Sequence, residues 1–217
     1  MKIFLDTANF EEISDKYVTG LIDGVTTNPT LIKKSGKDPY QVIKSISESF
    51  SEFESISAEV VSNTCEGMVE QAQPYLQLDN VTIKVPCTVE GLKACRQLRS
   101  IGATVNVTLI FSASQAVLAA KAGATYVSPF VGRLTDNGFD GLELIKSIRM
   151  IYDNCYDTSV PQILAASVRS PEVVALCYRE GADIVTIPSS IFDKMYESVL
   201  TREGLDIFQK DWDSINV

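Results

Sequence analysis

Val81-Thr82-Ile83-Lys84-Val85-Pro86 is an apolar, β-branched run with one lysine at its centre. Such a run is typical of a strand that is buried on both faces of a parallel sheet. A lone charge there costs free energy unless it is paired or neutralised. Burial favours the neutral amine, which attacks carbonyl carbons, so Lys84 is a candidate for Schiff-base chemistry. Position alone favours a plainer alternative, a lysine that reaches solvent or pairs with a carboxylate.

Similar short runs recur along the chain, with helical patterns between them. With the lysine strand, these eight runs occupy residues 3–6, 24–28, 56–61, 81–86, 104–110, 126–131, 162–167 and 183–188. Strands that alternate with helices in this way predict an α/β fold, a (β/α)8 TIM barrel. Helices are expected to begin after capping residues, of which the clearest are Asp38, Thr88, Ser112 and Ser170.

Length and composition predict one domain over residues 1–217, of which 45% are hydrophobic. The net charge of −9 argues against nucleic acid or an anionic membrane surface as a partner. Histidine is absent, which excludes Ser-His-Asp hydrolysis, Cys-His catalysis and histidine-ligated metal sites. The five cysteines form no CxxC pair, and the amino terminus lacks the apolar region of a signal peptide. We therefore expect a cytoplasmic protein.

A surplus helical pattern follows the eighth, over residues of about 201–214. Its apolar residues Leu205, Phe208, Trp212 and Ile215 are spaced to form one stripe. A complete barrel does not need this additional C-terminal helix. The stripe either covers the domain's own surface or packs on a neighbouring subunit, and we favour the neighbour because the only tryptophan of the chain lies on it.

Polar side chains collect where the predicted strands end, which in a barrel is the edge that carries catalytic residues. Each has an ordinary explanation when taken singly: Asn28 precedes a proline as turn residues do, and Glu59 is a natural ion-pair partner for Lys84. The joint pattern is more informative, because strands one to five all direct polar groups at one mouth. The candidate site consists of Asp6, Asn28, Glu59, Lys84, Asn106, Thr108, Ser128, Phe130, Arg133, Ser167 and Arg169.

These groups match the steps of a Schiff-base aldol reaction. Lys84 would attack a ketone carbonyl as the nucleophile. Glu59, through a water held by Thr108, would relay protons as the carbinolamine forms and loses water. Asp6 would then deprotonate the C4 hydroxyl as the neighbouring carbon–carbon bond breaks.

The remaining candidates would bind substrate. Asn28 and Asn106 are placed to hold substrate hydroxyls, and Ser128 to bind the C1 hydroxyl end.

A phosphate group is expected at Arg133, Ser167 and Arg169, which follow the sixth and seventh strands. Paired guanidinium groups match phosphate oxygens, and barrels often bind phosphate on this side. The alternative is a pair of surface ion pairs, Arg133 with Asp136 and Arg169 with Glu172. We favour phosphate binding.

The chain resembles the small-subunit branch of the transaldolase family, which includes fructose-6-phosphate aldolases. The resemblance covers essentially the whole chain, and its motifs are Phe4-Leu5-Asp6-Thr7-Ala8-Asn9, Gly24-Val25-Thr26-Thr27-Asn28-Pro29-Thr30, Ile83-Lys84-Val85-Pro86, Asn106-Val107-Thr108-Leu109-Ile110-Phe111-Ser112, Ser128-Pro129-Phe130-Val131-Gly132-Arg133 and Ala165-Ala166-Ser167-Val168-Arg169. It implies a class I mechanism without metal or organic cofactor and a place in the pentose phosphate pathway. It also implies the roles given above and a decamer of two pentameric rings, in which the carboxyl-terminal helix reaches a neighbour.

Two positions separate the branches of this family. Aldolases that release free dihydroxyacetone resemble this chain but carry Gln at position 59 and Tyr at position 130, whereas this chain has Glu59 and Phe130. A phenol near the enamine can protonate it and release the three-carbon unit, and phenylalanine cannot. The resemblance therefore implies a transaldolase, which transfers a dihydroxyacetone unit from a ketose phosphate (sedoheptulose 7-phosphate or fructose 6-phosphate) to an aldose phosphate (glyceraldehyde 3-phosphate or erythrose 4-phosphate).

Three alternatives remain open at this point. They are a fructose-6-phosphate aldolase, another lysine-dependent barrel aldolase such as one acting on deoxyribose phosphate, and a non-catalytic barrel that only binds sugar phosphates.

Overall fold

The computed structural model describes residues 1–155 and 160–215. Within them, eight parallel strands close into a barrel in the order of the chain, which confirms the predicted TIM barrel. Each strand lies within about two residues of its expected bounds. The strands are β1 (Lys2–Asp6), β2 (Gly24–Thr26), β3 (Ser55–Glu59), β4 (Val81–Pro86), β5 (Val105–Ile110), β6 (Tyr126–Pro129), β7 (Gln162–Ala165) and β8 (Ile184–Ile187).

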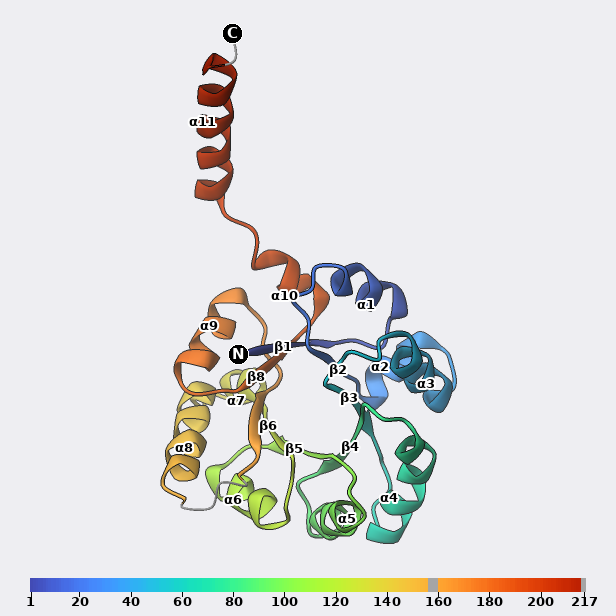
Figure 1. Ribbon diagram of the computed structural model, residues 1–217. Coiled ribbons are helices and arrows are strands. Elements are labelled where there is room, and N and C mark those ends of the chain that lie inside the picture. The colour runs from blue at the N-terminus through green and yellow to red at the C-terminus, as the bar shows by residue number, and fades with distance from the viewer. Residues whose placement is uncertain (156–159, 216–217) are drawn as a thin grey trace.

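Helices surround the barrel, as Figure 1 shows. The four helix starts expected from capping residues are confirmed, because each of those side chains accepts a backbone N–H of the first helical turn. The helices are α1 (Phe10–Tyr17), α2 (Pro29–Ser35), α3 (Pro39–Ser49), α4 (Cys65–Ala72), the 3₁₀ helix η1 (Gln73–Gln77), α5 (Val89–Ser100), α6 (Ala113–Lys121), α7 (Val131–Asp136), α8 (Gly141–Asp153), α9 (Pro171–Arg179), α10 (Ser189–Lys194) and α11 (Val199–Ile215). Among the described residues, we find no helix that combines the length and the apolar character of a membrane span.

The apolar core has two parts. The larger lies between the strands and the surrounding helices, and it contains the outward-facing residues of the strands, such as Leu5 and Val25. The smaller fills the barrel itself below the mouth and consists of Phe4, Tyr126, Leu164 and Ile184. Gly24 makes room for this inner layer, because a Cβ there would lie 2.8 Å from the Phe4 ring. The mouth above it is left to polar side chains.

The second strand ends earlier than expected. It stops at Thr26 instead of position 28, because Asn28 caps α2: its Oδ1 accepts the Leu31 N–H at 3.0 Å. From the sequence, Asn28 was expected to end a strand or to lie in a turn. In the structure it is the last residue before α2, and it also lines the mouth of the barrel.

Helix α11 stands away from the barrel in Figure 1. Within Val199–Ile215 no side chain is buried, and Leu205 and Phe208 are 61% and 71% exposed. The additional C-terminal helix is confirmed. It begins two residues before and ends one residue after the expected range 201–214.

Candidate active site

A cavity of about 380 Å³ opens at the carboxyl ends of the strands. It gathers most of the candidate residues from β1 to β7, although they are scattered over the whole sequence. The candidates that line it are Asp6, Asn28, Glu59, Lys84, Thr108, Ser128, Phe130, Arg133 and Ser167. Asn106 is buried just behind this lining, and its Oδ1 accepts the Ser128 hydroxyl at 2.8 Å.

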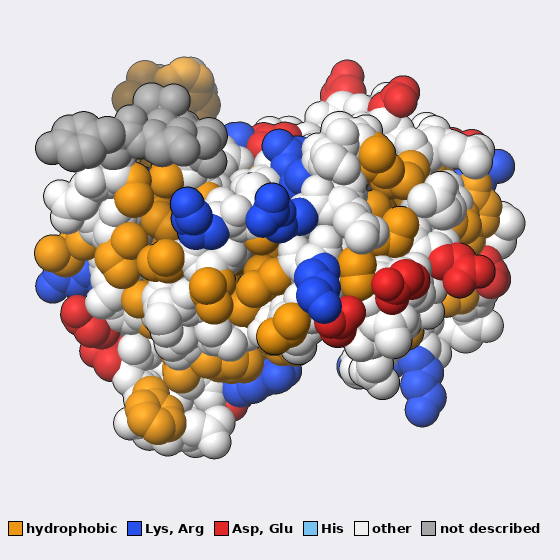
Figure 2. Space-filling model, turned by 90° about the horizontal axis from the view of Figure 1, so that it is seen from below, with side chains coloured by type: hydrophobic (Ala, Val, Ile, Leu, Met, Phe, Trp, Pro, Cys, Tyr) orange, Lys and Arg blue, Asp and Glu red, His pale blue; other side chains and the backbone are white. Residues whose placement is uncertain are grey.

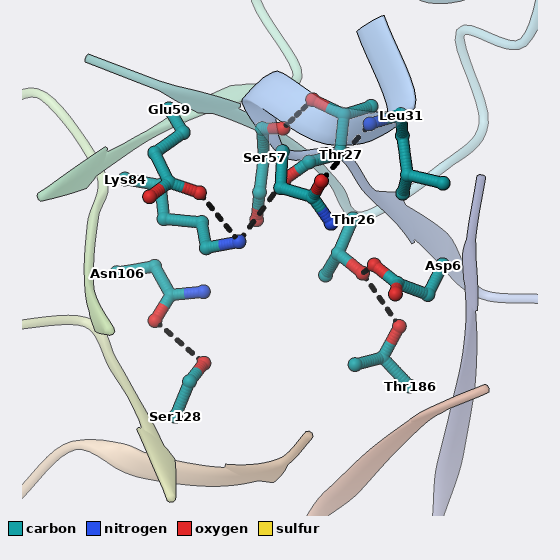
Figure 3. Close-up of polar contacts among 11 residues, drawn as sticks. Asp6, Thr26, Thr27, Leu31, Ser57, Glu59, Lys84, Asn106, Ser128 and Thr186 are labelled. Carbon is teal, nitrogen blue, oxygen red and sulfur yellow. Dashed lines mark hydrogen bonds and ion pairs between the residues drawn. The ribbon is translucent and has the colours of Figure 1, made fainter. Parts of the chain in front are cut away.

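Lys84 is only 6% exposed, so the alternative in which it reaches solvent is wrong. Its Nζ lies 3.0 Å from Glu59 Oε2 and donates to the Thr27 carbonyl oxygen, also at 3.0 Å. Figure 3 shows both contacts and the amine directed into the barrel. The ion pair named as the plainer alternative is therefore present. The two contacts use two of the three hydrogens of a protonated amine, and the 3.0 Å separation from Glu59 is also short enough for direct proton transfer between the two groups.

Asp6 lies on the opposite side of the mouth from Lys84 and Glu59 (Figure 3). Burial raises the pKa of the Asp6 carboxyl, while a hydrogen bond from Thr26 and the positive charge of Lys84 lower it. The net result is a carboxyl that holds its proton more strongly than an exposed aspartate does. A carboxylate with a raised pKa is a better general base near neutral pH.

Two buried polar atoms of β5 find no hydrogen-bond partner among the described residues, Thr108 Oγ1 and Asn106 Nδ2. An unsatisfied buried donor or acceptor costs about 1–3 kcal/mol. Such groups are retained where water or a ligand completes them. Both atoms belong to residues of β5 for which the sequence predicted a partner, a water at Thr108 and a substrate hydroxyl at Asn106.

The loop after β7 is held in a strained conformation. Ser167 has a φ of 59°, in the left-handed region that residues other than glycine rarely occupy. Its carbonyl oxygen accepts the Gly132 N–H at 3.0 Å, and a Cβ at position 132 would lie 2.0 Å from that oxygen. The glycine thus allows the start of α7, which carries Arg133, to pack against Ser167.

The two arginines are not equivalent. The Arg133 guanidinium lies over the Phe130 ring, 4.8 Å from its centroid, and faces the cavity. Arg169 is about half exposed and forms an ion pair with both carboxylate oxygens of Asp136, at 2.6 and 2.7 Å. A surface ion pair is therefore present, as the alternative expected, but it joins Arg169 to Asp136 and not to Glu172. Arg169 is not among the residues that line the cavity.

Several lining residues were not singled out from the sequence. Thr26 and Thr186 lie close to Asp6, and Leu31, Leu109, Leu164 and Ala166 also belong to the wall. Thr26 could have been found, because it alternates with Asn28 along the second strand and so shares its inward face. Thr186 gave a weaker signal, since a threonine in a strand is ordinary.

Comparison with known proteins shows which family this chain is similar to. The model of the family described as transaldolase/fructose-6-phosphate aldolase matches residues 3–216. A probable transaldolase of Novosphingobium aromaticivorans is 52% identical over 98% of this chain and 96% of its own length. One of Methanococcus vannielii is 50% identical over 99% and 98%. A solved structure described as native KDPGal is similar in fold, with a TM-score of 0.60 and 18% identity over 91% of this chain and 84% of that one.

Proposed function

Because this chain belongs to the transaldolase/fructose-6-phosphate aldolase family, as its motifs predicted, we propose that it is a transaldolase. It transfers a dihydroxyacetone unit from sedoheptulose 7-phosphate or fructose 6-phosphate to glyceraldehyde 3-phosphate or erythrose 4-phosphate. The observation that carries the proposal is the buried Lys84 amine, 3.0 Å from a carboxylate oxygen at the floor of a cavity of sugar-phosphate size.

The covalent step begins at this pair. Lys84 passes a proton to Glu59, and its lone pair attacks C2 of the ketose to give a carbinolamine. Glu59 returns protons through a water at Thr108, so that the C2 oxygen leaves as water and an iminium remains. The partnerless Thr108 hydroxyl supports this water position.

Cleavage then requires a base on the other side of the mouth. Asp6 takes the proton of the C4 hydroxyl, the C3–C4 bond breaks, and its electrons move to the iminium to form an enamine. The aldose product carries the new carbonyl at its former C4. Addition of the acceptor aldehyde reverses these steps, with Asp6 returning the proton. The raised pKa of Asp6 supports both directions, since the group must accept and release a proton.

The hydroxyls of the three-carbon unit are held by the remaining polar groups. Asn28 and Asn106 bind substrate hydroxyls, and Ser128 binds the C1 end. The hydrogen bond between Ser128 and Asn106 supports their action as one unit.

The phosphate lies at Arg133, Ser167 and Arg169. Arg133 already faces the cavity, whereas Arg169 must exchange its carboxylate partner Asp136 for the phosphate. Such an exchange is accessible, because exposed ion pairs contribute only about 0–1 kcal/mol.

The enzyme keeps the enamine until an acceptor arrives. Phe130 presents a ring without a hydroxyl to the cavity, so it offers no acid that could protonate the enamine carbon. A fructose-6-phosphate aldolase, which releases dihydroxyacetone, is the alternative. The test is the cleavage of fructose 6-phosphate with and without erythrose 4-phosphate. We expect fast turnover only with the acceptor, and equal rates without it would overturn the transferase assignment in favour of the aldolase.

We also propose that the protein is a homo-oligomer, pentameric or decameric, held in part by α11. Helices in proteins gain most of their stability by packing an apolar face, and α11, with 17 residues, has no side chain buried in this way among the residues that the structure describes. Figure 2 shows further hydrophobic side chains on the outer face of the barrel. On α6, the apolar side chains of Val117 and Leu118 are 38% and 54% exposed. The cytosol is the proposed location, since all five cysteines are free thiols.

A further inference from the structure

Two threonines with no role so far form a chain of contacts with the Asp6 carboxyl. Thr26 faces Asp6 directly across the β1–β2 pairing, and its hydroxyl donates to Asp6 Oδ1 at 2.8 Å. Thr186 on β8, the strand on the other side of β1, lies with its Oγ1 2.6 Å from that of Thr26. Thr26 and Thr186 are 2% and 3% exposed. Figure 3 shows the three side chains as one chain of contacts inside the barrel.

The direction of these hydrogen bonds follows from counting protons. An ionised Asp6 can only accept, so the single hydroxyl proton of Thr26 must point at it. The Thr26 oxygen can then only accept a hydrogen bond from Thr186, so the Thr186 hydroxyl must be the donor. The chain runs from Thr186 to Thr26 to Asp6, and both dipoles point at the carboxylate. Aligned hydrogen bonds of this kind polarise and strengthen one another.

We propose that Thr186 is a positioning residue which, through Thr26, holds Asp6 in its ionised form and aims the carboxylate at the substrate. The inference rests on the proposed role of Asp6 as the base. Thr186 acts without touching the reacting atoms: its hydroxyl fixes the orientation of the Thr26 hydroxyl, which alone contacts Asp6.

A positioning role explains why hydroxyls occupy this place. Valine has nearly the same shape as threonine and packs well in strands, so packing alone gives no reason for two buried hydroxyls. Each hydroxyl must find a partner when buried, and among the residues that the structure describes each bonds to the next member of the chain or to Asp6.

Other charges near Asp6 stay in place when Thr186 changes. In the mouth they are Lys84, Glu59 and Arg133. On the outer side, a second cavity reaches Asp6 and is lined by Glu11, Glu12, Lys34 and Lys37. A change in the titration of Asp6 after substitution of Thr186 is therefore due to the hydrogen-bond chain.

The test compares Thr186→Val, Thr186→Ser and Thr26→Val in the full chain. The first readout is the acidic limb of kcat/KM against pH, and the second is direct infrared titration of the Asp6 carboxyl, assigned by difference from Asp6→Asn. We expect both to move to higher pH, by about one unit for Thr26→Val and about half a unit for Thr186→Val. Thr186→Ser, which keeps the hydroxyl, restores the original values.

Thr82→Val is the matched control. Thr82 is an equally buried barrel threonine that bonds to Ser55 at 2.7 Å and to Thr104 at 3.1 Å, so its loss should leave the Asp6 titration unchanged. An infrared titration that does not move in Thr186→Val, or that moves equally in Thr82→Val or Thr186→Ser, would overturn the inference. If the infrared titration moves and the kinetic limb does not, the hydrogen-bond chain stands and the proposed role of Asp6 as the base fails.

Discussion

Lys84 and Glu59 are direct neighbours across the β3–β4 pairing, and their charged groups lie 3.0 Å apart inside the barrel mouth. Two adjacent strands thus fix the distance between the proposed nucleophile and the proposed proton carrier through their backbone register. Neither side chain depends on a mobile loop for its position. This rigidity suits a reaction in which the same proton must move out and back in every cycle.

The first prediction concerns Glu59→Gln. The amide keeps the shape and can still contact Lys84, but it cannot take a proton, and Phe130 does not supply the phenol that accompanies glutamine at this position in the aldolases. We expect kcat to fall by about 10²-fold or more, the usual contribution of general acid–base catalysis. Glu54→Gln is the control, because Glu54 pairs with Lys2 at the opposite end of the barrel. Steady-state kinetics check the result, and an undiminished kcat in Glu59→Gln would remove Glu59 from the mechanism.

The second prediction links Asp6 to stability. Because its pKa is raised in the folded protein, the folded state holds this proton at pH values where the unfolded chain has lost it. Stability therefore decreases as the pH rises from the ordinary aspartate pKa through the raised one. Asp6→Asn removes this loss, so we expect it to abolish activity and to stabilise the protein at neutral pH by about 0.5–2 kcal/mol.

Urea unfolding at several pH values measures this effect. The gain of Asp6→Asn over the parent protein should shrink as the pH falls below the raised pKa and should no longer change below the ordinary one. A gain that is the same at every pH would show that the ionised carboxylate is not its cause.

The third prediction concerns Phe130→Tyr. A phenol at this position gives the enamine a proton donor, so we expect release of dihydroxyacetone without acceptor to rise by at least about tenfold. Phe111→Tyr is the matched control, because its ring is 5.7 Å from that of Phe130 but does not line the cavity. An enzymatic assay for free dihydroxyacetone checks this, and equal release by both variants would argue against the proposed function of Phe130.

The fourth prediction concerns α11. Replacing Leu205 and Phe208 with glutamine removes two exposed apolar side chains from the stripe, and we expect the assembly to dissociate into smaller species. Glu203→Gln with Lys210→Gln changes the same helix without touching the stripe and should leave the mass unchanged. Sedimentation velocity distinguishes the two variants. If the stripe variant keeps the full mass of the parent protein, α11 does not hold the oligomer.

The sequence predicted most of the fold because its signals are local. Alternating runs and capping residues such as Asp38 and Thr88 act within a few positions, and the structure confirms them. Lys84 and Glu59 were predictable as neighbours because consecutive parallel strands usually pair.

Contacts that need the closed barrel were not predictable in this way. Thr186 meets Thr26 across 160 positions, and only the pairing of the last strand with the first brings them together. Arg169 likewise pairs with Asp136 from a neighbouring element, whereas the sequence offered the nearer Glu172. Exposed ion pairs differ by less than about 1 kcal/mol, which is too little for a sequence pattern to specify.

Reduction with borohydride during turnover of fructose 6-phosphate, followed by mass spectrometry of peptides, tests whether Lys84 forms a Schiff base. We predict a three-carbon adduct on Lys84, formed by reduction of the dihydroxyacetone Schiff base, and no adduct after Lys84→Met. An adduct on a different lysine, or full turnover by Lys84→Met, would contradict this prediction.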